Sequence, residues 1–295
     1  MNNAIKLWGL VEVLVPNEHE ELASWCLMQI SGATGCEVIP AGEERVLIKA
    51  SFEQESISPE QLELIAQFLV EHGLEHCVET LRSGNIEQQD WLAKWKENFR
   101  SFKVGDRITI CPPWERNDTV SGADPGVVLV IDPAMAFGTG LHATTQFCLR
   151  AIQTAKLGPS VLDVGTGSGI LAIAAVLLND NISVTAIDND PVAIDAARRN
   201  CSLNNVGDRI ELIVGSTESV AGRRFDAILS NLTCEDIISL LPSYRQLLAS
   251  GGAVICAGVL AEKQGRLEAA IPHHGFSIER AETEGMWCGL ILRRN

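Results

Sequence analysis

The sequence predicts an α/β protein in which a doubly wound, largely parallel, Rossmann-like sheet follows a small ferredoxin-like α+β domain. Three observations lead to this prediction. From residue 160 onward, apolar strands alternate with amphipathic helices. A glycine-rich turn follows the first of these strands, as it does in Rossmann-like sheets. The stretch from residue 6 to residue 82 instead follows the order strand, helix, strand, strand, helix, strand.

In the N-terminal region the hydrophobic pattern changes between the period of a strand and the period of a helix. Ser58, Pro59 and Glu60 mark the start of a helix, and Gly73 marks its end. Turn residues at 83–85 then interrupt the pattern. The expected strands are 6–15, 35–39, 45–50 and 76–82, and the expected helices are 17–31 and 60–71.

Aromatic residues gather between the two regions. Trp91, Trp95 and Phe99 are spaced four apart and share one face of a predicted short helix. We interpret this face as a packing stripe, and the alternative is a set of ligand-binding rings. The later strands are expected at 106–111, 127–131, 160–164, 183–187, 209–213, 225–230 and 253–257, the later helices at 169–178, 191–204, 235–249 and 261–272, and a closing antiparallel hairpin at 276–281 and 286–293.

The composition excludes several classes of protein. The 295 residues are 46% hydrophobic and 21% charged, which suits a globular chain with room for two domains. We find no apolar run of about 18 residues and no secretory signal, and we expect a cytoplasmic protein. The nine cysteines are scattered and include no CxxC pair, so we expect reduced thiols and neither disulfides nor a zinc site.

The net charge of −15 is concentrated near the N-terminus. Residues 1–90 hold 16 Asp and Glu against 4 Lys and Arg, a net of −12. This charge predicts either a solubilising surface or a docking face for a basic partner. It disfavours nucleic acid as a direct partner, because phosphate binding needs a basic patch.

The strand at 160–164 leads into a glycine loop with Asp163 just before it. Gly165, Gly167 and Gly169 have the spacing GxGxG, whereas dinucleotide-binding loops have GxGxxG. Glycines are needed where the backbone must approach a ligand closely. A carboxylate beside the loop is a poor neighbour for a pyrophosphate, so the loop points away from dinucleotide binding.

Polar side chains end two further strands of the alternating region. Asp188 ends the second strand, where a carboxylate can accept both ribose hydroxyl protons. We interpret Asp190 as a helix cap before Pro191. Asn231 ends the fourth strand, where an amide can orient an amine or a cofactor. The alternative for Asn231 is a cap for the helix that follows.

Residues 131–145 read IDPAMAFGTGLHATT. This segment resembles the IDPGxAFGTGxHxTT signature of the methyltransferases that modify the eleventh protein of the large ribosomal subunit (L-eleven). The resemblance continues through 162–175, 186–194, Asn200 and Asn204. The sequence departs from the family pattern at Ala134 and Met135, at Ala143, and at Leu232 and Thr233.

The resemblance implies a class I methyltransferase with S-adenosyl-L-methionine as cofactor. It implies a substrate-recognition domain at 1–85, a linker helix with lead-in strands at 86–130, and the methyltransferase domain at 131–295. The expected reaction is methylation of amino groups of ribosomal protein L-eleven, on lysine side chains, the N-terminal α-amine or both. The alternatives are a different protein or a small molecule as acceptor. No metal is expected.

The resemblance also implies roles for individual residues. His142 and Asn231 are expected to position the reacting groups. From the chemistry of the reaction, His142 and Asp132 are both candidates for proton handling, with a structural role as the alternative for each. Phe137, Gly138, Thr139 and His142 are expected to cover the site. The expected cofactor-binding residues are Thr144, Thr145, Asp163, Gly165, Gly167, Gly169, Asp188 and Asn231.

Overall fold

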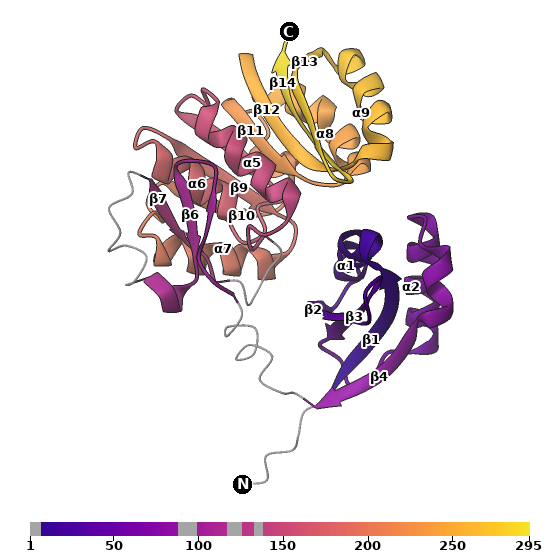
Figure 1. Cartoon of the computed structure of the whole chain (residues 1–295). Helices are drawn as coiled ribbons and strands as arrows, with labels where there is room; N and C mark the ends of the chain where they lie inside the picture. Colours follow the sequence, from indigo (N-terminus) through magenta and orange to yellow (C-terminus); the bar gives the residue numbers. More distant parts are fainter. Residues whose placement is uncertain (1–6, 88–98, 117–125, 133–137) are drawn as a thin grey trace. The chain divides into compact units, whose positions relative to one another are not determined.

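The computed structural model describes residues 7–87, 99–116, 126–132 and 138–295, and Figure 1 follows the chain from end to end. The chain divides into two units, Met1–Asn98 and Phe99–Asn295. Of the predicted aromatic stripe, Trp91 and Trp95 lie outside the described residues, and Phe99 is buried. The sequence-based boundaries at residues 85 and 130 stay predictions.

The N-terminal unit has the ferredoxin-like order of elements that the sequence predicts. Its sheet has the order β2-β3-β1-β4, and each neighbouring pair is antiparallel. The helices α1 and α2 connect the strands of this sheet (Figure 1). The elements are β1 (Leu7–Pro16), α1 (Glu20–Met28), β2 (Ala33–Pro40), β3 (Arg45–Phe52), α2 (Pro59–Glu71) and β4 (Arg82–Glu87).

The strand predicted at 76–82 is wrong. Residues Glu75–Thr80 form a 3-10 helix, and β4 begins only at Arg82. The strand includes Gly84 and Asn85, which the sequence pattern indicated as a break. Backbone pairing explains the difference, because β4 pairs residue by residue with β1 along the edge of the sheet. This pairing outweighs the low strand propensity of glycine and asparagine.

The second unit is built on a seven-stranded sheet of order β10-β9-β8-β11-β12-β14-β13. The first five of these strands are parallel, and β14 is antiparallel to both of its neighbours. The strand order reverses between β8 and β11, and ligands bind at such a reversal in open α/β sheets. The strands are β8 (Ser160–Val164), β9 (Ser183–Asp188), β10 (Ile210–Val214), β11 (Phe225–Asn231), β12 (Leu248–Leu260), β13 (Phe276–Glu284) and β14 (Trp287–Arg294).

Helices cover both faces of this sheet (Figure 1). One hydrophobic cluster joins the sheet to α5, α6 and a small sheet of β5, β6 and β7, and a second cluster joins it to α8 and α9. These elements are β5 (Phe102–Val104), β6 (Ile108–Cys111), β7 (Val127–Val130), α5 (Ala143–Thr154), α6 (Ile170–Leu178), α7 (Pro191–Leu203), α8 (Cys234–Leu247) and α9 (Gln264–Ala270).

Two features of the second unit differ from the sequence-based expectation. The helix predicted at 261–272 is longer than the α-helix in the structure. The α-helix α9 is flanked by the 3-10 turns Ala261–Lys263 and Ile271–His274. Pro272 lies in the second turn, and Gly275 ends it with a φ of +75°. The helix α5 was not predicted, although its apolar residues at 147, 148, 151 and 152 have helical spacing.

The nine cysteines all fall within the described segments, where they are free thiols, and eight of them are buried. Burial raises the pKa of Cys256 to about 12 and that of Cys201 to about 11, so these thiols behave as small apolar side chains. In the part of the chain that the structure describes, no helix is long and apolar enough to cross a membrane.

A buried hydrogen bond between α8 and β11 gives a test of the core. Tyr244 and Ser230 are fully buried, and their hydroxyl oxygens are 2.8 Å apart. We expect Tyr244→Phe or Ser230→Ala alone to lower the free energy of unfolding by about 1–3 kcal/mol. Each variant leaves the other buried hydroxyl group without its hydrogen-bond partner. Urea denaturation measures this change.

The double variant is the control for that experiment. Replacing both hydroxyl groups removes the polar pair together, so the double variant is expected to lose less than the sum of the two single losses. Strictly additive losses would contradict the role given to this hydrogen bond.

Candidate active site

The glycine turn that follows β8 is closed against the end of β9. The N–H of Gly165 donates to the carbonyl oxygen of Ile187 at 2.9 Å. Gly165, Gly167 and Gly169 have φ angles of +70°, +54° and +80°, a region that side-chain-bearing residues rarely adopt. The turn therefore depends on glycine, and Leu232 and Ala197 pack where side chains at Gly165 and Gly169 would lie.

Asp188 lies at the carboxyl end of β9 and is half-buried. Its Oδ2 accepts a hydrogen bond from the N–H of Gly167 at 2.9 Å, and its Oδ1 accepts one from the N–H of Asp190 at 3.0 Å. Each carboxylate oxygen has a further lone pair, so Asp188 can still accept two hydroxyl protons. Asp190 caps α7 through Val192, as the sequence predicted.

Asp163 is buried beneath the glycine turn. Its Oδ2 accepts a hydrogen bond from the hydroxyl of Thr166 at 2.6 Å, whereas Oδ1 is buried without a hydrogen-bond partner among the described residues. Burial raises the pKa of Asp163 from 3.8 to about 7, and the Thr166 hydroxyl opposes this rise. A cationic group placed beside Oδ1 would favour the ionised carboxylate.

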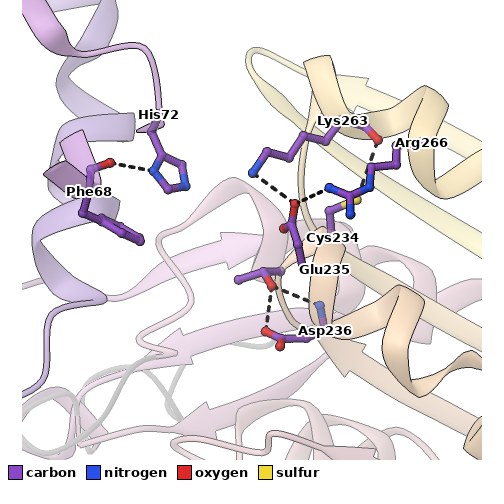
Figure 2. Close-up of polar contacts among 8 residues, drawn as sticks. Phe68, His72, Cys234, Glu235, Asp236, Lys263 and Arg266 are labelled. Carbon is purple, nitrogen blue, oxygen red and sulfur yellow. Dashed lines mark hydrogen bonds and ion pairs between the residues drawn. The ribbon is translucent and has the colours of Figure 1, made fainter. Parts of the chain in front are cut away.

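Asn231 ends β11 and connects it to α5. Its Nδ2 donates a hydrogen bond to Oγ1 of Thr145 at 3.2 Å, and Thr145 is buried. The alternative role of Asn231 as a helix cap is wrong, because Thr233 caps α8 and its Oγ1 accepts from the N–H of Asp236 at 3.2 Å (Figure 2). The amide of Asn231 is therefore directed toward α5 at the carboxyl edge of the sheet.

His142 caps the N-terminus of α5. Its Nδ1 accepts from the N–H of Thr144 at 3.4 Å and lies 2.7 Å from Oγ1 of the same residue. Its ring packs edge-on against Trp287, with ring centroids 4.7 Å apart. Burial lowers the pKa of His142 from 6.5 to about 4, so the ring is neutral at pH 7 and is a weak base there.

Asn200 has a role that the sequence did not predict. This residue is buried in α7, and its Nδ2 donates to the carbonyl oxygen of Ser168 in the glycine turn at 2.8 Å. Its Oδ1 accepts from the N–H of Asp132 at 2.9 Å. Oγ of Ser168 in turn donates to the carbonyl oxygen of Gly138 at 2.7 Å. Asn200 thus joins the glycine turn to Asp132, and Ser168 joins it to Gly138. Residues 133–137, which include Phe137, lie outside the described residues.

Two exposed valines lie beside Asp188, and the sequence did not predict them as site residues. Val214 of β10 is in register with Asp188, and Val192 lies in the first turn of α7. Each is 53% exposed, so its side chain is accessible to a ligand bound beside Asp188. Hydrophobic periodicity identifies buried residues only, so the sequence carried no signal for them.

These groups suit a ligand that has a positive charge, a ribose and an aromatic base. The unpartnered oxygen of Asp163 suits the cation, Asp188 suits the ribose hydroxyl groups, and the exposed valines suit the flat face of the base. S-adenosylmethionine has all three features. Among the described residues, no group of three or more His, Cys, Asp and Glu side chains forms a metal site.

The strand order, the GxGxG turn and the acids beside it define a class I S-adenosylmethionine-dependent methyltransferase. The family model described as ribosomal protein L11 methyltransferase (PrmA) matches residues 7–295. The chain belongs to this family of protein methyltransferases, and L11 is the L-eleven protein of the large ribosomal subunit. The match does not favour a small-molecule methyltransferase.

Individual relatives agree with the family model. The chain is 35% identical to the ribosomal protein L11 methyltransferase of Pelobacter propionicus over 256 residues, which is 84% of this chain and 81% of the relative. It is 33% identical to that of Gloeobacter violaceus over 280 residues, 94% of this chain and 84% of the relative. The crystal structure of the ribosomal protein L11 methylase from Lactobacillus delbrueckii subsp. bulgaricus has a TM-score of 0.61 and 32% identity, and the match covers 67% of this chain and 100% of that chain.

The raised pKa of Asp163 predicts pH-dependent cofactor binding. We expect the affinity for S-adenosylmethionine to be about tenfold lower at pH 6 than at pH 8, because the cationic cofactor needs the ionised carboxylate and the free protein titrates it near pH 7. Isothermal titration calorimetry at the two pH values measures this difference. In Asp163→Asn the affinity should be lower at pH 8 and nearly independent of pH, and a wild-type affinity that does not change between pH 6 and pH 8 would contradict the assignment.

The same pKa shift affects the stability of the free protein in the opposite direction. Cofactor affinity is expected to rise with pH, whereas the free energy of unfolding is expected to fall. The folded state holds the Asp163 proton more tightly than the unfolded state does. The resulting stabilisation is complete below the unfolded pKa of 3.8 and is lost as the pH rises through about 7. Saturating cofactor is expected to weaken this loss.

Proposed function

We propose that this enzyme transfers methyl groups from S-adenosylmethionine to amino groups of ribosomal protein L11, and that the acidic N-terminal unit docks this substrate. The observation that carries the proposal is the extent of the family match, which includes the acidic unit as well as the methyltransferase sheet. The amino groups proposed as acceptors are lysine side chains, the N-terminal α-amine or both.

The acceptor amine must be neutral to attack the methyl carbon. For a lysine of pKa about 10.4, deprotonation costs about 4.6 kcal/mol at pH 7, and for an α-amine of pKa about 7.7–8.0 it costs about 1 kcal/mol. Desolvation beside a positive charge lowers either pKa. The nitrogen–carbon bond then forms as the sulfur–carbon bond breaks, and the amine proton goes to solvent. Good alignment accounts for about 7–11 kcal/mol in reactions of this kind.

The bound cofactor supplies an activated methyl group, and the chain supplies its alignment. We propose that Asp163 holds the positively charged end of the cofactor and that Asp188 holds the ribose. The glycine turn at 165–169 allows the close approach, and Thr145, with its neighbour Thr144, lines the site from α5. No strong base is required by this arrangement.

On the acceptor side, we propose that Asn231 and His142 are positioning residues. Asn231 lies at the strand end where the reacting groups meet, and its amide is held by Thr145. The pKa of His142, near 4, suits a neutral cap of α5 better than a proton acceptor at pH 7. Proton handling by His142 or Asp132 stays a prediction.

The docking proposal rests on the charge of the N-terminal unit. Exposed carboxylates line α2 and the 3-10 helix after it, at Glu60, Glu63, Glu71, Glu75 and Glu79. Complementary charge steers a basic partner to such a surface and raises the association rate more than the final affinity. A basic protein substrate is therefore expected to reach this unit first, and salt is expected to weaken its capture.

Mass spectrometry tests the reaction and its acceptor together. Purified ribosomal protein L11 from the same organism, incubated with the enzyme and S-adenosylmethionine, is expected to gain mass in steps of one methylene. Peptide mapping then identifies the modified amino groups. Omission of the cofactor is the control. No mass gain, in an experiment where cofactor binding is verified, would contradict L11 as the acceptor.

Charge reversal on α2 tests the docking surface. We expect Glu63→Lys combined with Glu71→Lys to raise KM for L11 severalfold and to leave KM for S-adenosylmethionine unchanged, because the variant loses attraction for a basic protein only. Steady-state kinetics at low and moderate salt measure both constants.

A matched control has the same charge change elsewhere. Asp180→Lys combined with Asp208→Lys alters exposed loops before β9 and β10, at the amino edge of the large sheet. This control is expected to keep the wild-type KM for L11. Equal effects of the two pairs would show that net charge, and not the α2 surface, governs capture.

A further inference from the structure

Strand β12 has an extra residue beside Asn231. Its register with β14 shifts between Cys256 and Val259, because these two residues are three positions apart while their partners on β14 are two positions apart. The bulge comprises Ala257 and Gly258, at the carboxyl edge of the sheet. Bulges bend a strand locally and are over-represented beside active sites.

Gly258 lies against the backbone that follows Asn231. Its φ is +92°, and a methyl group there would overlap the carbonyl oxygen of Leu232. The same methyl group would lie 2.9 Å from the carbonyl carbon of Leu232 and 3.1 Å from Oδ1 of Asn231. The N–H of Leu232 also donates to the carbonyl oxygen of Ala257 at 3.0 Å. The bulge therefore fits directly against Asn231 and Leu232, without space for a side chain.

A second attachment holds the other end of the same segment. Glu235 forms ion pairs with Nζ of Lys263 at 3.3 Å and with Nη1 of Arg266 at 3.0 Å, and both partners lie beyond the end of β12 (Figure 2). Beside them, Sγ of Cys234 lies 3.7 Å from the carbonyl oxygen of Lys263. The segment 231–235 is thus joined to the bulge in β12 at one end and to the chain after β12 at the other.

These contacts limit where the Asn231 amide can lie. Its Nδ2 is held by Thr145 of α5, and its Oδ1 faces Gly258. A shift of the segment 231–235 would move the amide relative to the glycine turn. Leu232 of this segment packs against the turn, since its side chain lies 2.6 Å from the position that a methyl group on Gly165 would take. A misplacement of about 1 Å can reduce the rate of a chemical step by about 100-fold.

We propose that Gly258 and Glu235 are positioning residues for methyl transfer, because they lock the segment 231–235 from opposite ends and so fix the amide of Asn231 at the acceptor side of the site. The proposal rests on the proposed function for the role of Asn231 and for the choice of L11 as acceptor. Neither residue is assigned contact with substrate or cofactor.

The first test is Gly258→Ala against Gly251→Ala. Both glycines belong to β12 and both have positive φ, but a methyl group on Gly251 meets nothing within 4 Å. Gly258→Ala is expected to lower kcat on L11 by about 10- to 100-fold, with a much smaller change in the Kd of S-adenosylmethionine. Gly251→Ala is expected to keep the wild-type kcat, since it introduces the backbone strain without the contact.

A double-variant cycle separates positioning from general damage. In the Asn231→Ala variant, the added Gly258→Ala change is expected to lower kcat by less than about threefold, because the side-chain amide that it would displace is already absent. An equally large loss on both backgrounds would show that Gly258 acts on the site without Asn231, and it would overturn the proposal.

The second test does not depend on folding of a strained variant. Glu235→Gln removes the charge that holds Lys263 and Arg266, and it is expected to lower kcat severalfold with cofactor affinity retained. Glu211→Gln is the matched control, because it breaks a comparably exposed ion pair with Arg223 at β10. A normal kcat for Glu235→Gln would overturn the proposal for that residue even if Gly258→Ala does not fold.

The outcomes distinguish this proposal from the proposed function. If the wild-type enzyme binds S-adenosylmethionine but does not methylate L11, the proposed acceptor is wrong. If the wild-type enzyme methylates L11 and both Gly258→Ala and Glu235→Gln retain its kcat, the reaction stands and the positioning role is wrong.

Discussion

The turn between β8 and α6 makes three left-handed backbone conformations in five residues, and the geometry of the site depends on it. The N–H groups of Gly165 and Thr166 both donate to Ile187, and the N–H of Gly167 donates to Asp188. The turn and the end of β9 are therefore fixed to each other by backbone hydrogen bonds through Ile187, and the side chain of Asp188 accepts a further one. Ordinary side-chain rotation cannot separate them, so the ends of β8 and β9 behave as one rigid unit.

The remaining parts of the site are attached to this unit one by one. Asn200 joins it to the segment that precedes α5, and Thr145 joins α5 to the end of β11. The bulge at Gly258 then fits β12 against β11. A site assembled in this way takes its shape from the order of strands in the sheet, which explains why residues from positions 132 to 258 of the chain meet at one edge.

Sequence reasoning located the parts of the site that have local signals. The GxGxG spacing indicated the turn, and the strand pattern placed Asp188 at the end of β9 beside it. The helix α5 was missed because its residues were interpreted as a motif, although its apolar spacing was available. The strand β4 and the bulge at Gly258 had no local signal, because each is created by pairing with a strand that is distant in the sequence. The role of Asn200 likewise depends on three segments that only the fold brings together.

Negative charge has two different roles in the two units. In the N-terminal unit, exposed carboxylates stay solvated, so their effect is long-ranged and sensitive to salt. In the methyltransferase unit, Asp163 is buried and its pKa rises to about 7, so its effect is short-ranged and sensitive to pH. The proposed capture of a basic protein and the proposed contact of Asp163 with the cationic cofactor are therefore expected to respond to different variables, which allows the two steps to be measured separately.

We propose that the cofactor lies across the carboxyl ends of β8 and β9, with Asp188 as its ribose ligand. The most direct measurement compares the affinity for S-adenosylmethionine of Asp188→Ala with that of Asp190→Ala by calorimetry. Both acids accept backbone hydrogen bonds, but only Asp188 is proposed to contact the cofactor. The account predicts a loss of about tenfold or more for Asp188→Ala, since hydrogen bonds to a charged group contribute about 1.5–3 kcal/mol each, and a near-normal affinity for Asp190→Ala. Equal losses in the two variants, or no loss in Asp188→Ala, would contradict this placement of the cofactor.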